Sequence, residues 1–114
     1  MKFALFAFRG DMLCFVHVLI NALDTAERGG EARIIFEGEA VKLVGELARE
    51  DAQFHGLYRQ CKEKGLIAGA CKACSAKLGV TEAVRAENLP LMEGAKGHPS
   101  MAEWRDDGYE IVTF

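Results

Sequence analysis

The stretch that decides the fold runs from Leu66 to Val80 and reads LIAGACKACSAKLGV. An uncharged apolar run leads into two cysteines, and Gly79 closes the turn that follows them. This pattern predicts a buried strand over 66–70 that delivers Cys71 to the start of a short helix over 71–78. A helix start offers free N–H groups and partial positive charge, and Lys72 adds a cation; all three favour a thiolate. We therefore expect Cys71 to be a reactive thiol with a pKa below its usual value of about 8.5.

The composition is that of a single soluble domain covering residues 1–114. Half of the residues are apolar and 27% are charged, with a formal net charge of -3. The acidic balance and the lack of a basic cluster argue against direct binding to nucleic acid. No apolar run reaches the roughly 18 residues of a membrane span, and Arg9–Asp11 interrupts the N-terminal run. We expect a cytoplasmic protein without a membrane partner, whose cysteines are reduced.

Apolar runs and helical spacing alternate along the rest of the chain. Strands are expected at 3–8, 32–36, 66–70, 89–92 and 109–114, and helices at 12–28, 40–48, 51–65, 71–78, 81–87 and 99–108. Asp11, Asp51 and Thr81 are predicted to cap the helices that follow them. In the last helix, Met101 and Trp104 are predicted to point inward.

Strands that alternate with helices predict an α/β fold, a three-layer α/β/α sandwich with a mostly parallel five-stranded sheet. Right-handed crossovers place every loop that follows a strand at one edge of such a sheet, where ligands bind. The loops expected there are Arg9–Asp11, Glu37–Glu39, Cys71–Cys74 and Glu93–Gly97. The last of these is glycine-rich, and we expect it to be mobile.

Two interpretations stay open for each cysteine of the pair. Cys71 is either the reactive thiol or a small buried hydrophobic residue. Cys74 is either an accessory thiol, which attacks a species formed on Cys71 and releases its cargo by disulfide formation, or a residue facing the core. Cys14 and Cys61 lie on the apolar faces of their predicted helices, and we interpret both as structural.

Other polar residues near the expected edge have weaker signals. Glu37 and Glu39 are candidates to exchange protons with the cysteine site, although acids at such positions also cap helices. His98 precedes Pro99 and is interpreted as a turn or capping residue, or as one that lines the site.

We expect no bound metal and no cofactor. A zinc site needs four ligands, commonly from two cysteine pairs or from one pair and histidines. Only one such pair exists, and the three histidines show no partnering spacing. The chain also lacks a GxGxxG pattern or a phosphate-binding loop with lysine.

The most specific part of the chain is 71–80, in which Cys71 stands eight positions before Gly79. Together with the opening MKFA and the terminal IVTF, this layout resembles the DsrE/DsrF-like sulfur-relay family. Its members include sulfurtransferase subunits of tRNA thiolation and of dissimilatory sulfur oxidation. The resemblance implies a DsrE-like, flavodoxin-like α/β domain with a persulfide on Cys71. It also implies protein partners that donate and accept sulfur, and homo-oligomers such as trimers or hexamers.

The leading hypothesis is therefore a small sulfur carrier or sulfurtransferase-like protein that holds sulfane sulfur on Cys71. One alternative is a dithiol redox protein that uses Cys71 and Cys74 reversibly. The other is a non-catalytic oligomeric binding domain in which the cysteines are structural.

Overall fold

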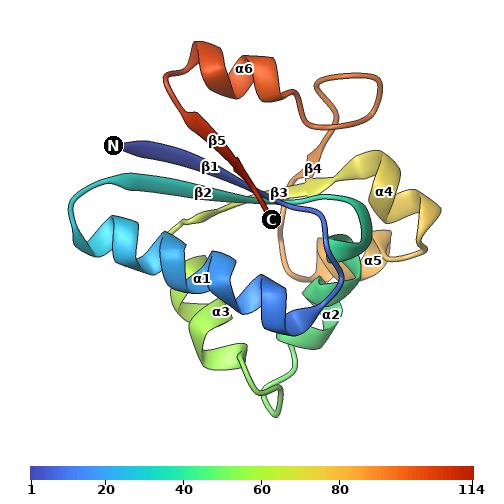
Figure 1. Cartoon of the computed structure of the whole chain (residues 1–114). Coiled ribbons are helices and arrows are strands. Elements are labelled where there is room, and N and C mark those ends of the chain that lie inside the picture. The colour runs from blue at the N-terminus through green and yellow to red at the C-terminus, as the bar shows by residue number, and fades with distance from the viewer.

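A computed structural model describes all residues, 1–114, and contains one five-stranded sheet (Figure 1). The strands are β1 (Lys2–Ala7), β2 (Glu31–Phe36), β3 (Ile67–Cys71), β4 (Leu91–Met92) and β5 (Glu110–Thr113). They lie in the order β4-β3-β2-β1-β5, and every neighbouring pair is parallel. The predicted α/β fold is confirmed, and all five strands lie within the predicted segments or extend them by one residue.

The helices also follow the predicted order. They are α1 (Met12–Glu27), the 3-10 helix η1 (Gly38–Lys42), α2 (Leu43–Leu47), α3 (His55–Glu63), α4 (Lys72–Lys77), α5 (Thr81–Ala86) and α6 (Met101–Asp106). The predicted helix over 40–48 is thus divided into a 3-10 turn and one short α-helix. None of these helices has the length and apolar character needed to cross a membrane.

The two helical layers are unequal for a topological reason. From β1 to β4 the chain steps across the sheet in one direction, so right-handed connections place α1, α2, α3 and α5 on the same face. The return from β4 to β5 runs to the other side of β1 and places α6 on the opposite face (Figure 1). The core on the face covered by α1, α2, α3 and α5 holds 21 buried residues, whereas the cluster between the sheet and α6 holds four. The helical layer formed by α6 is therefore thin.

Local capping differs from the prediction at several helices. Asp11 accepts a hydrogen bond from the backbone N–H of Leu13, as predicted. Asp51 pairs with Arg49 instead, and α3 begins only at His55. Thr81 is the first residue of α5 rather than its cap.

The last helix also differs from the prediction. Ser100 caps α6 by accepting a hydrogen bond from the N–H of Glu103. Trp104 packs edge-on against Tyr109, with the ring centroids 4.8 Å apart. The inward position predicted for Met101 is wrong, because the thin layer leaves its side chain exposed.

Candidate functional site

The carboxyl ends of two neighbouring strands bring the predicted site residues together. Glu37 directly follows β2, and Cys71 is the last residue of β3. Cys74 lies one turn further on in α4, while His98 comes from the connection between β4 and α6. Because β2 and β3 are parallel neighbours, residues that follow them meet at one edge, as the topology predicted.

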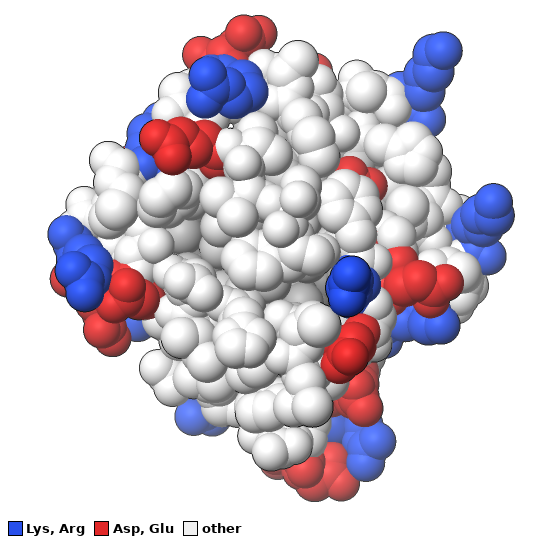
Figure 2. Space-filling model, in the orientation of Figure 1, with Lys and Arg blue, Asp and Glu red and all other residues white.

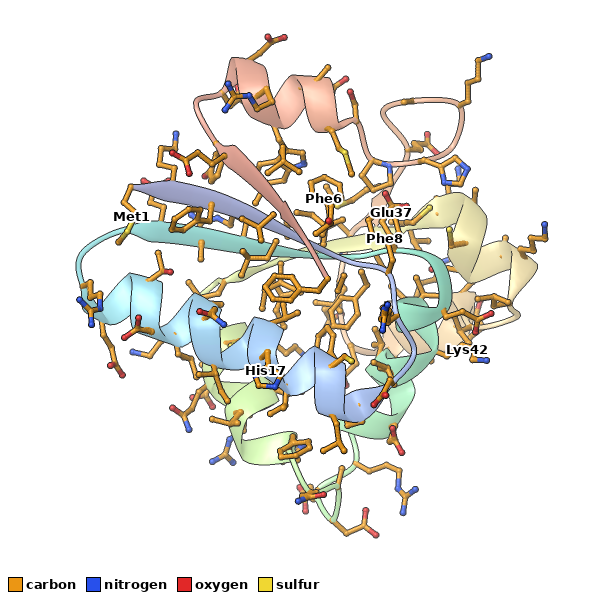
Figure 3. The ribbon with its side chains drawn as sticks, viewed as in Figure 1. Met1, Phe6, Phe8, His17, Glu37 and Lys42 are labelled. Carbon is orange, nitrogen blue, oxygen red and sulfur yellow. The ribbon has the colours of Figure 1, made fainter.

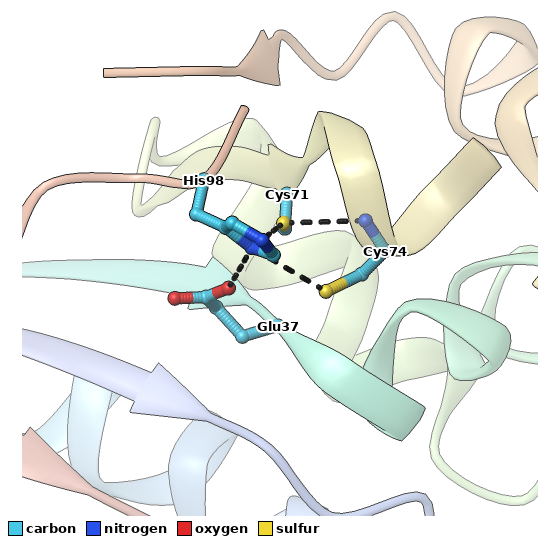
Figure 4. Close-up of side chains that lie close together, drawn as sticks. All are labelled: Glu37, Cys71, Cys74 and His98. Atoms are coloured by element: carbon cyan, nitrogen blue, oxygen red, sulfur yellow. Dashed lines mark hydrogen bonds and ion pairs between the residues drawn. The ribbon is translucent and has the colours of Figure 1, made fainter. Parts of the chain in front are cut away.

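One nitrogen stands at the centre of this cluster, as Figure 4 shows. Nδ1 of His98 lies 3.0 Å from Sγ of Cys71, 3.9 Å from Sγ of Cys74 and 3.7 Å from Oε1 of Glu37. Sγ of Cys71 also accepts a hydrogen bond from the backbone N–H of Cys74 at 3.3 Å. Glu37, Cys71 and Cys74 were predicted to belong to one site. His98, for which a place lining the site was one of two interpretations, is their common neighbour.

The site is buried on one side and open on the other. Cys71 is fully buried and Glu37 is 6% exposed, whereas the side chain of His98 is 49% exposed. Cys74 is half-buried. Reagents therefore reach the sulfur atoms from the side of His98 and Cys74.

The expected low pKa of Cys71 is wrong. Burial raises the pKa of this thiol to about 12, and hydrogen bonds with Cys74 and Glu37 add to the rise. Only the backbone N–H of Cys74 opposes it. The helix that follows has only six residues, and the ammonium of Lys72 pairs with Glu93 instead of facing the sulfur. Cys71 is a neutral thiol unless a group in contact takes its proton.

A tight turn positions His98. Ala95 and His98 exchange two backbone hydrogen bonds, and Lys96 and Gly97 between them both have positive φ, 52° and 86°. This is the geometry of a two-residue type I′ turn. The carbonyl of Gly97 accepts a hydrogen bond from the N–H of Ala73, which fastens the turn to α4. The tip of the glycine-rich loop is thus a regular turn held against α4, and the mobility expected of this loop stays a prediction.

Comparison with known proteins places the chain in a family. The uncharacterized protein MJ0733 of Methanocaldococcus jannaschii is 30% identical over 102 residues, which cover 90% of this chain and 81% of that protein. The chain belongs to the family of MJ0733. No family model matches the sequence. Among solved structures, a conserved protein of unknown function from Bacteroides thetaiotaomicron, BT1422, has a TM-score of 0.75. It is 22% identical and covers 99% of this chain and 94% of its own, which shows a shared fold.

The acids of this MJ0733 family member have separate roles. Glu37 occupies the cap position of η1, but its side chain makes no capping hydrogen bond and points to the ring of His98 instead (Figure 4). Glu39 pairs with Lys42 at 2.7 Å on the surface and takes no part in the site. Of the two predicted proton-exchange candidates, the structure therefore brings only Glu37 to the cysteines.

The remaining cysteines lie away from the site. Cys61 is fully buried, its Sγ lies 3.6 Å from the carbonyl of Leu19, and burial raises its pKa to about 12. Cys14 is half-buried rather than part of the core, and it lines an open cavity of about 570 Å³ at the carboxyl ends of β1 and β5. His17 lines the same cavity, and Figure 3 shows it on α1, on the opposite side of the sheet from Phe6.

Sequence spacing alone did not identify His98 as the central residue. It is 24 positions from Cys74 and 27 from Cys71, so no local motif joins them. The available signal was topological: His98 follows the glycine-rich loop after β4, at the same edge of the sheet. Pro99 adds a second signal, because a residue before proline is held in an extended conformation.

Proposed function

We propose that this protein carries sulfane sulfur as a persulfide on Cys71 and passes it to a partner. The observation that supports this best is the contact of 3.0 Å between Sγ of Cys71 and Nδ1 of His98. A buried thiol needs a base in contact before it can act as a nucleophile, and a neutral imidazole is such a base. The resemblance of 71–80 to DsrE/DsrF-like relay proteins points to the same residue.

Loading of Cys71 is a thiol exchange with a donor persulfide, R–S–SH. The proton of the Cys71 thiol passes to Nδ1 of His98, and the thiolate attacks the outer, sulfane sulfur of the donor. The new S–S bond forms on Cys71 as the donor S–S bond breaks. The leaving thiolate RS⁻ takes the proton back from His98 and departs as RSH, so no external oxidant or reductant is needed.

Release follows one of two routes. An acceptor thiolate attacks the outer sulfur and leaves with it, which returns Cys71 to a thiolate. Alternatively, the Cys74 thiolate attacks the inner sulfur, Sγ of Cys71, and expels hydrosulfide while a Cys71–Cys74 disulfide forms. In the second route the two thiols are oxidised by two electrons and the sulfane sulfur is reduced to sulfide. A thiol reductant then restores the pair.

Donor and acceptor proteins would dock at the exposed side of His98, since the opposite side of the site is buried. We propose thiol-bearing proteins as both partners. The same face admits small persulfides.

A dithiol redox role is the second candidate. The two sulfur atoms lie within 4.8 Å of one another, so modest motion of α4 brings them to bonding distance. Exchange with an oxidised disulfide, R–S–S–R, would give the Cys71–Cys74 disulfide and two thiols RSH. A pair that stays reduced in excess glutathione disulfide would exclude this role.

The experiment that tests sulfur carriage is mass spectrometry after incubation with a persulfide donor and a metal chelator. We expect the peptide that contains Cys71 to gain one sulfur atom in the wild type and in Cys14→Ser, the matched control. Cys71→Ser should gain none, and Cys74→Ser should retain the added sulfur longer. No gain in the wild type, or an equal gain in Cys71→Ser, would overturn the proposal.

A further inference from the structure

Too many partners surround Nδ1 of His98 for ordinary hydrogen bonding. A ring nitrogen has a single proton or a single lone pair, which lies in the ring plane and serves one good hydrogen bond. Here Cys71, Cys74 and Glu37 each place an atom within 3.9 Å of that nitrogen. All four ligand-type atoms lie within 4.8 Å of one another. Such mutual proximity is typical of a coordination shell.

From this convergence we infer that Glu37, Cys71, Cys74 and His98 form a zinc site. The ion would take Sγ of both cysteines, Nδ1 of the histidine and one carboxylate oxygen of the glutamate, and each thiol would give up its proton on binding. This proposal reverses the expectation that the chain binds no metal. That expectation relied on sequence spacing, which does not describe ligands from three separate segments.

The distances require only small movements to reach tetrahedral geometry. Zinc bonds of about 2.3 Å to sulfur and 2.0–2.1 Å to nitrogen and oxygen give edges of roughly 3.8 Å between two sulfurs, 3.6 Å from sulfur to nitrogen and 3.3 Å from nitrogen to oxygen. The corresponding nitrogen-centred distances are 3.0 and 3.9 Å to the sulfurs and 3.7 Å to the oxygen. Each differs from its ideal value by less than about 1 Å.

The buried carboxylate is an independent reason to place a cation here. Glu37 is 94% buried, and its only ion-pair partner is the ring of His98, which is charged only when protonated. An ionised carboxylate in such a position is costly without a cation. Its side chain points into the cluster and makes no cap, so a divalent ion among the four ligands would compensate it directly (Figure 4).

Donor chemistry selects zinc over the common alternatives. Two thiolates and an imidazole suit a borderline-soft ion and disfavour magnesium and calcium, which take oxygen ligands. The single carboxylate suits divalent zinc better than monovalent copper, which prefers sulfur. Four protein ligands leave no open position on the zinc ion. While zinc is bound, neither sulfur can react with a persulfide donor. The zinc proposal does not depend on sulfur carriage, because metal binding is measured without any sulfur donor.

Cobalt substitution tests the site directly, since tetrahedral Co²⁺ bound by thiolates absorbs strongly in the visible and near-ultraviolet ranges. We expect one Co²⁺ per chain in the wild type, displaced by one Zn²⁺, and a zinc-dependent rise in melting temperature. Cys71→Ser and Cys74→Ser should each lose part of the thiolate absorption, because each removes one of the two thiolate ligands. Glu37→Gln and His98→Gln should weaken zinc binding by at least about 10-fold, because loss of an outer-shell partner alone costs that much.

Matched controls use residues of the same type outside the cluster. Cys14→Ser, His17→Gln and Glu39→Gln should bind Co²⁺ like the wild type. Circular dichroism shows whether Cys71→Ser folds. If it does not, His98→Gln still tests the site, because the side chain of His98 is exposed. No stoichiometric metal in the wild type, or unchanged zinc affinity in both Glu37→Gln and His98→Gln, would refute the zinc site. Sulfur loading of Cys71 would then still be tested separately, by mass spectrometry in the presence of a chelator.

Discussion

Gly97 is the residue whose backbone sets the position of His98. Its φ of 86° lies in the left-handed region, which L side chains avoid at a cost of about 1–2 kcal/mol. A Cβ at this position would also approach Cβ of Ala73 to 3.3 Å. The neighbour belongs to α4, between the two cysteines, so any shift that relieves this contact moves the histidine relative to both sulfurs.

Gly97→Ala is therefore expected to lower stability and to disturb the site together. Gly29 offers a matched control, since its φ is 85° and nothing lies within 4 Å of its would-be Cβ. Both variants should lose about 1–2 kcal/mol in the free energy of unfolding measured with urea. Only Gly97→Ala should slow the alkylation of Cys71. Equal alkylation rates in the two variants would show that the turn does not control the site.

Tyr58 joins α3 to α5 through a hydrogen bond that crosses between the two helices. Its hydroxyl donates to Oε1 of Glu87 at 2.6 Å, and Lys62 pairs with the same oxygen at 3.1 Å. Burial acts to raise the pKa of Glu87, but the Tyr58 hydrogen bond and the charge of Lys62 outweigh it and lower that pKa. The ionised carboxylate is thus the form that ties the helices together.

Tyr58→Phe is expected to destabilise the fold in a pH-dependent way. A carboxyl whose pKa is lowered on folding contributes stability that is complete above its unfolded pKa of about 4.3 and is lost as the pH falls through the folded value. The variant should lose about 1.5–3 kcal/mol at neutral pH, typical of a hydrogen bond to a charged group, and less below about pH 4. Urea unfolding across pH gives the comparison. In a Glu87→Gln background the pH dependence of the Tyr58 effect should vanish; its persistence there would assign it to another group.

The elements were predictable to the extent that their signals are local. The apolar run before Cys71 and the helical spacing over 12–28 each need only a short window of sequence, and both elements form where predicted. Asp51 has the right residue type for a cap, but its pairing with Arg49 depends on where the loop turns. The pKa of Cys71 depends on packing from the whole fold, which a helix-start argument cannot supply.

The molecule as a whole presents a face with few charges. Most charged side chains in Figure 2 lie towards the rim, and the centre of this view, over β5 and α1 in Figure 1, is uncharged. On α1, Leu13 is 68% exposed and Ile20 is 47% exposed. They are seven positions apart, which places them on one side of the helix two turns from each other. The apolar surface of α1 thus extends beyond the side that packs on the sheet.

We propose that this face binds a second copy of the chain. A surface with few charges offers a charged partner nothing to pair with, whereas self-association through one repeated patch satisfies rotational symmetry. Sedimentation velocity should show a dimer heavier than the 12.5 kDa monomer, because a patch that pairs with its own copy closes a two-fold contact. Leu13→Lys with Ile20→Lys should shift it to the monomer, because burying two unpaired ammonium groups is costly.

Met101→Lys, on the exposed side of α6, is the matched control and should leave the assembly intact. A wild-type chain that stays monomeric at every concentration, or an equal effect of Met101→Lys, would rule out this face.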